Sequence, residues 1–272
     1  RDGGDTTVQS AWFLRNDTDA DGAPTITEVN RSNLDSPTST VNNPGSSFTI
    51  DPDGSDDFTY KAANGGTPDQ ATVDVQEDSS GNFAGDGDSE IIVGTSGSEV
   101  LDGNGGNDVL FGNGGTDTLN GGAGDDWLVY DNDDIIDGGT EFDVLRFESN
   151  VDIQIDGETG ETGEVNIVNR VNNIEAIDLR NGAADDFGND GESGEDALSA
   201  ADVINMTDAD ATLYIMGDNN DEVRLDGNWT LGATAQVNDP TRPDINGLTF
   251  TQYTLGGATV FVQSNVDVDN NL

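Results

Sequence analysis

A nine-residue repeat occupies the middle of the chain and constrains its fold more than any other feature. Two positions stay in phase through it: an acidic residue, and an aliphatic residue two places later. Successive repeats are spaced by nine, nine, nine, eight and nine residues, a regularity that random glycine-rich sequence would not maintain. The acidic residues are Glu99, Asp108, Asp117, Asp126, Asp134 and Asp143, and the aliphatic residues are Leu101, Leu110, Leu119, Leu128, Ile136 and Leu145.

Each position of the repeat has a physical role. Glycines allow the turn half of each repeat to adopt backbone angles that aim carbonyl oxygens inward at one point. The acidic residue adds a carboxylate there, and stacked turns bring these oxygens within calcium-binding distance, while the aliphatic residues stack inside. The predicted calcium ligands of the repeats are Glu99, Gly103, Gly105, Asp108, Gly112, Gly114, Asp117, Gly121, Ala123, Asp126, Asp134 and Asp143.

Calcium binding and folding should be coupled in such a segment. A single turn can neither bury its leucine nor complete a coordination shell, so the carboxylates repel one another until calcium binds. The alternative interpretation is a flexible acidic glycine linker. A linker needs no phased leucines, so the repeat favours a stacked structure.

The line GGAGDDWLV, which begins at Gly121, resembles most fully the nonapeptide signature GGxGxDxUx of the RTX family. The resemblance covers roughly residues 94 to 147 and implies a right-handed parallel β-roll with calcium ions between its turns. Two lines depart from the signature. Glu99 replaces the expected aspartate, and the segment from Tyr130 to Asp137 is one residue short.

The net charge and the composition of the chain exclude several functions. The chain has 55 acidic and 9 basic residues and a net charge of −46, so nucleic acids and anionic membranes are poor partners. It contains no cysteine and no histidine, which excludes disulfides, cysteine nucleophiles, most zinc sites and Ser-His-Asp triads. Its single lysine, Lys61, lies outside any phosphate-binding loop. We therefore expect no enzymatic activity.

Residues 1–82 predict a separate β-rich module. The alternating segments SSFTI (46–50), DFTYK (57–61) and ATVDV (71–75) are separated by turn clusters, as in a small β-sandwich. The stretches FLRNDTDADG and FTYKAANGG resemble the cadherin-like or bacterial Ig-like extender domains of large adhesins. That resemblance implies a spacer role, with calcium stiffening the joints to neighbouring extender domains of the same chain.

A second calcium-binding pattern lies in this module. Asp17, Asp19 and Asp21, followed by Glu28, have the ligand spacing of an EF-hand loop, with Gly22 at its sixth position. The sequence TITEV that follows alternates like a strand rather than a helix. We therefore interpret the pattern as a calcium loop between strands, with an acidic surface turn as the alternative.

Residues 151–272, after a roll at 83–150, predict a β-rich cap with one short helix. Its expected features are one or two strands in 164–180, a helix capped by Ser199, a strand at 212–216 and a hairpin that turns at Gly256 and Gly257. Asp218, Asp221 and the acidic loop at 185–196 are either calcium ligands or solvated turns. The predicted fold is thus mostly β: a sandwich, a parallel roll and a cap.

The cap also resembles the C-terminal region of giant RTX adhesins exported by type I secretion. The similar stretches are VNNIEAIDLRNG, LSAADVINMTDADATLYIMGDN and GGATVFVQ. The resemblance implies an uncleaved export signal in the last tens of residues, the type I secretion machinery as a partner, and folding on calcium outside the cell. We expect a monomeric fragment from the C-terminal end of a secreted or cell-surface adhesin of the biofilm or ice-binding type, without a membrane span or an N-terminal signal peptide.

Two other functions remain possible at this point. The chain can be the calcium-folding tail of an RTX exoenzyme such as a protease or lipase, whose catalytic domain would lie upstream. It can also bind a ligand, including ice, although ice binding requires a regular array along many turns. The outward residues of the roll vary instead: Ser98, Asn107, Thr116 and Asp125.

Overall fold

The computed structural model of the 272-residue chain covers both the repeats and most of the C-terminal region. The residues that it describes are 6–9, 25–31, 47–50, 58–63, 69–73, 82–87, 89–131, 134–147, 152–154, 164–167, 169–181, 184–187 and 197–270.

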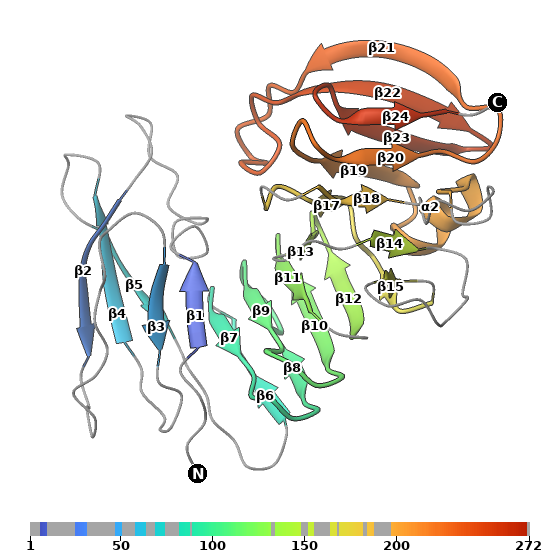
Figure 1. Ribbon diagram of the computed structural model, residues 1–272. Helices are drawn as coiled ribbons and strands as arrows, with labels where there is room; N and C mark the ends of the chain where they lie inside the picture. The colour runs from blue at the N-terminus through green and yellow to red at the C-terminus, as the bar shows by residue number, and fades with distance from the viewer. Residues whose placement is uncertain are drawn as a thin grey trace.

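The repeats form two parallel sheets that the chain enters alternately, with one strand for each nonapeptide (Figure 1). Leu101, Leu119 and Ile136 are paired in register in one sheet, and Leu110 and Leu128 in the other. The first sheet contains β6 (Asn82–Ala84), β8 (Val100–Asp102), β10 (Thr118–Ala123) and β12 (Ile135–Thr140), and the second contains β7 (Ile91–Val93), β9 (Val109–Phe111), β11 (Trp127–Tyr130) and β13 (Val144–Phe147). The arrangement is consistent with the predicted β-roll.

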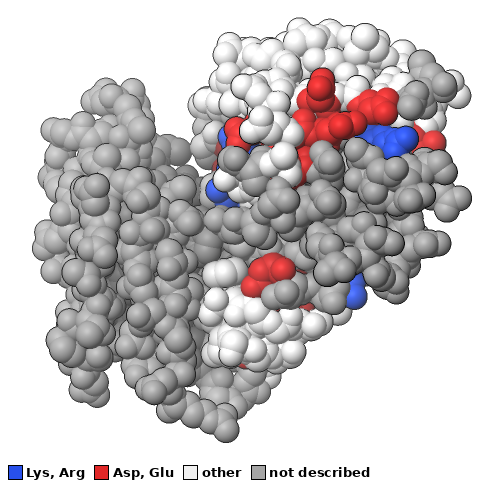
Figure 2. Space-filling model, viewed as in Figure 1, with Lys and Arg blue, Asp and Glu red and all other residues white. Residues whose placement is uncertain are grey.

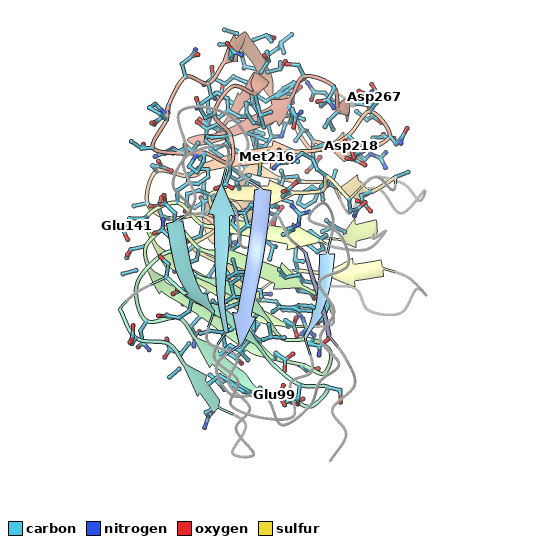
Figure 3. The ribbon with its side chains drawn as sticks, turned by 90° about the vertical axis from the view of Figure 1, so that its left-hand side faces the viewer. Glu99, Glu141, Met216, Asp218 and Asp267 are labelled. Carbon is cyan, nitrogen blue, oxygen red and sulfur yellow. The ribbon has the colours of Figure 1, made fainter. Side chains whose placement is uncertain are left out.

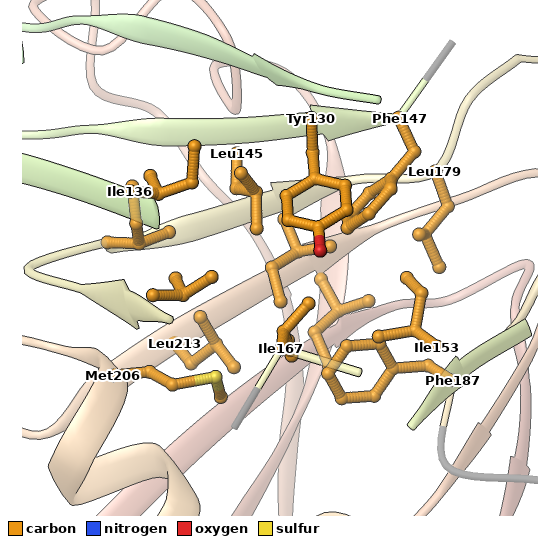
Figure 4. Packing of buried hydrophobic residues seen from close by; sticks show 14 of the residues in the cluster. Tyr130, Ile136, Leu145, Phe147, Ile153, Ile167, Leu179, Phe187, Met206 and Leu213 are labelled. Atoms are coloured by element: carbon orange, nitrogen blue, oxygen red, sulfur yellow. The ribbon is translucent and has the colours of Figure 1, made fainter. Parts of the chain in front are cut away.

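The predicted aliphatic positions form the core of the roll. All six are completely buried: Leu101, Leu110, Leu119, Leu128, Ile136 and Leu145. Each stacks on its counterpart one coil away, and burying such a side chain contributes roughly 1.5–3 kcal/mol. At the end of the repeats, larger side chains fill the core (Figure 4). The rings of Tyr130 and Phe147 lie 5.4 Å apart there, and the same core continues to Ile153 and Phe187.

The parallel ladders continue beyond the repeats. In the second sheet β13 pairs with β17 (Ala176–Asp178), then β19 (Thr212–Met216) and β23 (Ala258–Gln263), while β12 pairs with β16 (Val171–Asn172). A third sheet contains β14 (Asp152–Gln154), β15 (Glu164–Asn166), β18 (Asp186–Phe187), β20 (Glu222–Arg224) and β24 (Asp267–Asp269), all parallel. The division into three domains stays a prediction, but its boundary at residue 150 falls between strands of one continuous sheet.

The short helix of the C-terminal region lies where it was predicted. Helix α2 (Ala200–Met206) begins after Ser199, whose side chain accepts a hydrogen bond from the Asp202 backbone. The Asp202 carboxylate accepts one from the Ser199 backbone at 2.9 Å, which completes a capping box. Val203 and Met206 anchor the helix in the core of the roll. The mostly β architecture with one short helix is thus confirmed for the described residues.

The predicted hairpin closes the second sheet. Strand β22 (Thr249–Leu255) pairs antiparallel with β23, and the turn between them contains Gly256 (φ 61°) and Gly257 (φ 102°). Positive φ angles at both positions are typical of a tight hairpin turn and favour glycine. Beyond β22, β21 (Thr230–Gln236) forms the exposed edge of the sheet.

A second apolar cluster covers the outer face of this nine-stranded sheet. Trp127 and Phe142 belong to it, together with Phe250 and Ile245 from the segment around β22. The Trp127 indole Nε1 donates a hydrogen bond to Asp244 Oδ1 at 3.0 Å, and the Arg242 guanidinium lies 4.8 Å from the centre of the Phe142 ring. The sheet is therefore buried on both faces near the end of the repeats.

Antiparallel strands occupy the N-terminal region, and four of the five overlap segments predicted to be extended, whereas β1 was not predicted. β1 (Thr6–Gln9) pairs with β3 (Ser47–Ile50), and β2 (Thr25–Arg31) pairs with β4 (Phe58–Ala63), which pairs with β5 (Asp69–Val73). The sandwich itself stays a prediction. Of the predicted EF-hand-like ligands, Asp17, Asp19 and Asp21 lie outside the described residues. Glu28 lies in β2, opposite Lys61.

Candidate metal centre

The acidic residues of the repeats turn into the interior of the roll. Five aspartates at the predicted positions are at most 1 % exposed, and Glu99 is 8 % exposed. Carboxylates are rarely buried to this extent without a compensating charge or hydrogen bonds. These aspartates are Asp108, Asp117, Asp126, Asp134 and Asp143.

One oxygen of each carboxylate is bonded to the backbone of the preceding coil. Asp117 Oδ1 accepts a hydrogen bond from the backbone N–H of Glu99, 18 residues earlier, at 2.8 Å. Asp126 Oδ1 accepts the same bond from Asp108 at 2.7 Å, and Asp143 Oδ1 from Asp126 at 2.9 Å. Because one coil holds two repeats, the bonds form two ladders, one on each side of the roll.

The other oxygen of these carboxylates is left for a different ligand. Oδ2 of Asp117 is buried and accepts no hydrogen bond. The same holds for Oδ2 of Asp108, Asp126 and Asp143, whose Oδ1 atoms are bonded. A buried polar oxygen without a hydrogen bond costs on the order of 1–3 kcal/mol, and a charged oxygen costs more. A cation at this position would remove that cost.

The space beside each such oxygen exists because the residue facing it is glycine. A Cβ atom on Gly121 would lie 2.5 Å from the carbonyl oxygen of Gly138 in the next coil and still closer to Asp126 Oδ2. A Cβ on Gly103 would likewise lie 2.5 Å from the Gly121 carbonyl oxygen and would contact Asp108 Oδ2. Carboxylate and carbonyl oxygens of adjacent coils thus converge on one point, and these are the ligands that calcium prefers.

The remaining predicted ligands lie in the same turns. Gly105 forms an isolated bridge with Ala123 of the next coil, and the Ala123 carbonyl accepts a hydrogen bond from Gly106 at 2.9 Å. Gly112 faces the Asp117 carboxylate, and Gly114 has a φ angle of 91°, in the region that glycine favours. Their roles as ligands stay predictions.

Burial shifts the proton affinity of these carboxyls. It raises the pKa of Asp108 to about 8, with the negative charges of Asp126 and Glu90 adding to the rise. Burial also raises the pKa of Asp117 to about 6 and that of Asp134 to about 7, and repulsion from Asp131 contributes to both. Each of these groups therefore favours either a proton or a bound cation.

Three carboxylates meet at the short repeat. Asp117, Asp131 and Asp134 each offer an oxygen within 4.8 Å of the others. Asp131 was absent from the predicted ligands because the nonapeptide has no acidic residue at its position. The eight-residue step was the only signal in the sequence that this turn differs from the others.

The acidic ladder also extends beyond the repeats on both sides. Asp108 Oδ1 accepts the backbone N–H of Glu90 at 2.8 Å, and Glu175 Oε2 accepts that of Asp143 at 3.0 Å. In the third sheet, Asp221 Oδ1 accepts the backbone N–H of Asp185 at 3.1 Å. Asp221 is buried, so it does not lie in a solvated turn. Sequence reasoning missed Glu90 and Glu175, although both precede an aliphatic residue by two places.

Glu175 has the same environment as the aspartates of the repeats. Its Oε1 atom is buried and accepts no hydrogen bond, and burial raises the pKa of its carboxyl to about 7. Asp178, which is completely buried, behaves differently. It contacts Arg146 at 2.8 Å and Arg180 at 2.7 Å. Burial alone would raise the pKa of Asp178, but the two guanidinium groups lower it overall.

On the face of the molecule that Figure 2 shows, acidic side chains gather over the C-terminal region, and a smaller acidic patch lies over the roll. Figure 3 places Glu99 near the lower end of the molecule and Asp218 and Asp267 near the upper end. The acidic character therefore extends along the described structure and is not confined to the repeats.

The comparison with protein families agrees with this geometry. Residues 93–128 match the family described as the RTX calcium-binding nonapeptide repeat, in four copies. The fold and the site define this part of the chain as an RTX-repeat roll, and the resemblance of GGAGDDWLV is confirmed. No curated protein and no solved structure matches the chain. Within the described residues, no helix has the length and apolar character needed to cross a membrane.

Proposed function

We propose that the chain is a calcium-binding RTX module that folds when calcium binds, and that it has no catalytic role. The observation that carries the proposal is the repeated meeting of a buried carboxylate oxygen, which has no hydrogen bond, with a carbonyl oxygen of the next coil, as at Asp126 and Gly138. Calcium is a hard cation that accepts six to eight such oxygens, whereas magnesium requires a tighter octahedron.

Calcium would act as part of the core of the roll. Without a cation, ionised carboxylates such as Asp108 and Asp126 lie one above another in a buried position, and their repulsion opposes stacking. With calcium, the same groups hold adjacent coils together, so that the free energy of binding becomes free energy of folding. The role of the chain's residues is to supply these oxygens, and the stacked leucines then exclude water.

The test is a calcium titration followed by circular dichroism and by the fluorescence of Trp127, which is buried in β11. A cooperative gain of β structure with calcium, but not with magnesium, is expected. A Trp127→Phe variant identifies the part of the fluorescence change that arises in the roll. An unchanged signal between excess chelator and millimolar calcium would rule out coupled folding and leave the acidity as a surface adaptation.

At the level of the whole protein, we propose that the module ends a large secreted adhesin and carries its type I export signal. The antiparallel strands before the roll and the stretches similar to adhesin C-terminal regions support this proposal. RTX repeats are typical of secreted proteins, which favours an extracellular location.

Export of fusion proteins tests the signal. A reporter fused to residues 151–272 is expected to leave cells that contain a type I exporter, whereas a reporter fused to residues 1–150 should stay inside. Retention of both fusions would refute the export signal. A catalytic domain found directly upstream of residue 1 would instead favour the tail of an exoenzyme.

A further inference from the structure

We propose that the short repeat forms a cation site of a different kind, in which Asp131 joins Asp117 and Asp134 and which fills at the lowest calcium concentration. The proposal rests on the calcium-binding function proposed above and adds a third carboxylate that the nonapeptide pattern does not contain. It makes the irregular repeat the site at which calcium binding to the roll begins.

The geometry of the three side chains supports a shared ion. Their ligand oxygens lie within 4.8 Å of one another, although like charges repel at this distance. Asp134 is held by two backbone N–H groups, from Asp117 at 2.8 Å and from Asp131 at 3.4 Å. In contrast, Asp117 Oδ2 and Asp131 Oδ1 are both buried and accept no hydrogen bond. Two residues of the cluster therefore each have a buried oxygen without a hydrogen bond, and the third carboxylate is fixed by the backbone.

The loss of one residue explains why this site differs. In a regular repeat, a glycine stands five places before the aspartate, as Gly112 does before Asp117 and Gly121 before Asp126. The segment from Tyr130 to Asp137 has no glycine before its aspartate. The three atoms nearest to a Cβ on Gly112 all belong to Asp117, whereas at Gly103 and Gly121 a carbonyl of the next coil is among them. Here the carboxylate of Asp131 supplies an oxygen that the glycine turns supply elsewhere.

The charge of the site predicts the order of binding. The affinity of calcium sites rises with the number of charged ligands and with the rigidity of the site, over several orders of magnitude. A regular turn of this roll offers one acidic side chain at its cradle, as Asp126 does at Gly121. At the short repeat, Asp131 and Asp134 meet Asp117 of the regular repeat one coil earlier, which brings three carboxylates together, two of them buried. Because the interior has a low effective dielectric constant, the attraction for a divalent cation is stronger here than at the surface.

Calorimetric calcium titration of the whole chain and of two variants tests this order. The wild type should show one tight class of site and a weaker class. Asp131→Asn is expected to weaken the tight class by roughly tenfold or more, because one of three charged ligands is lost. Asp137→Asn removes the same charge from an exposed position of the same repeat and should leave both classes unchanged. Tight binding in Asp131→Asn equal to the wild type would overturn the proposal.

A second measurement needs no variant. Carboxyl groups of the wild-type chain are labelled with a carbodiimide and an amine at increasing calcium concentration, and the labelled residues are quantified by mass spectrometry. Asp131 should become protected at a lower calcium concentration than Asp108. Simultaneous or later protection would refute the order of filling. If calcium protects no carboxylate and the wild type binds none, the proposed function itself fails, which is a separate outcome.

Discussion

Gly103 and Asp108, two residues of one repeat, contribute differently to the candidate calcium site. Asp108 supplies charge, because one of its oxygens is fixed by the backbone of Glu90 while the other faces the next coil. Gly103 supplies space, because any side chain there would contact that oxygen and the Gly121 carbonyl. The backbone of Gly103 does not have a positive φ angle, so the need for glycine is one of space and not of conformation.

Gly103→Ala should therefore impair calcium binding more than it changes the backbone. The methyl group would occupy the position between Asp108 and Gly121, and we expect the calcium midpoint of folding to rise roughly tenfold, a loss of about 1.4 kcal/mol. Gly87→Ala is the matched control, since a Cβ at Gly87 would meet no atom within 4 Å. Equal midpoints for the two variants, measured by circular dichroism, would contradict the assignment of the cradle.

The raised pKa values predict how pH affects the calcium-free chain. The pKa is about 6 for Asp117, about 7 for Asp134 and about 8 for Asp108 in the folded state. All lie above the value of about 3.9 for an unfolded aspartate. The stability from these groups is therefore fully present below about pH 4 and is lost as the pH rises through about 6 to 8.

In excess chelator, acidification from pH 8 to pH 5 should consequently restore part of the β structure, because protons neutralise the buried carboxylates in place of calcium. The calcium affinity should change in the opposite direction and rise between pH 5 and pH 8. Both trends can be followed by circular dichroism. A calcium-free chain that loses structure on acidification over this range would show that other carboxylates dominate the pH dependence.

The strands of the roll are short, and the stacking of their side chains holds them together. Many strands of the roll have only three or four residues, too few to be stable alone. Leu119 in β10 lies between Leu101 of β8 and Ile136 of β12, so each leucine contributes to the coils on both sides. In the first sheet, the residues on the outer face contribute less to the packing, as the exposed side chain of Ile135 shows.

Leu119→Ala is expected to destabilise the calcium-loaded chain by roughly 2–5 kcal/mol, since it leaves a cavity at a completely buried position. Ile135→Ala removes a similar volume from a side chain that is 47 % exposed and should cost much less. Urea unfolding at saturating calcium measures both. A cost of less than about 1 kcal/mol for Leu119→Ala would show that the inner face of the roll is not tightly packed.

In the molecule as a whole, the repeats and the C-terminal coils differ in the charged groups that surround their buried carboxylates. In the repeats, carboxylates such as Asp117 have no basic residue among their electrostatic partners. In the C-terminal coils, Asp178 is neutralised by Arg146 and Arg180 of the same chain. The outer apolar cluster around Trp127 and Phe250 adds packing that needs no cation.

Calcium removal should therefore affect the two regions unequally. Hydrogen exchange followed by mass spectrometry is expected to show loss of protection in residues 91–131 when calcium is chelated at neutral pH, with greater residual protection in residues 212–263. The physical reason is that the buried carboxylates are concentrated in the repeats, including Asp108, Asp117 and Asp126, whereas Asp221 is the buried carboxylate of the second region. A uniform loss of protection would show that the continuous sheet unfolds as one cooperative unit.

The parallel roll and the burial of the repeat aspartates could be predicted from the amino-acid sequence. A period of nine with two phased positions requires contacts that recur at a constant separation, and Leu101 and Asp108 lie where that period predicts. Ser199 was sufficient to predict the start of the helix, and Gly256 and Gly257 were sufficient to predict the hairpin turn, because capping and tight turns involve only neighbouring residues. These features need no knowledge of distant contacts.

The continuation of the acidic ladder and the meeting of the three carboxylates could not be predicted from the sequence, because both depend on how the coils stack. Asp143 is bonded to Glu175, 32 residues away, and Asp185 to Asp221, 36 residues away, so no single period describes these coils. Asp131 has no counterpart in the nonapeptide and joins Asp117 only because a shortened turn stacks on a regular one. A repeat specifies contacts at its own spacing. Once the lengths of the coils vary, the pairing depends on which side chains fill the shared core.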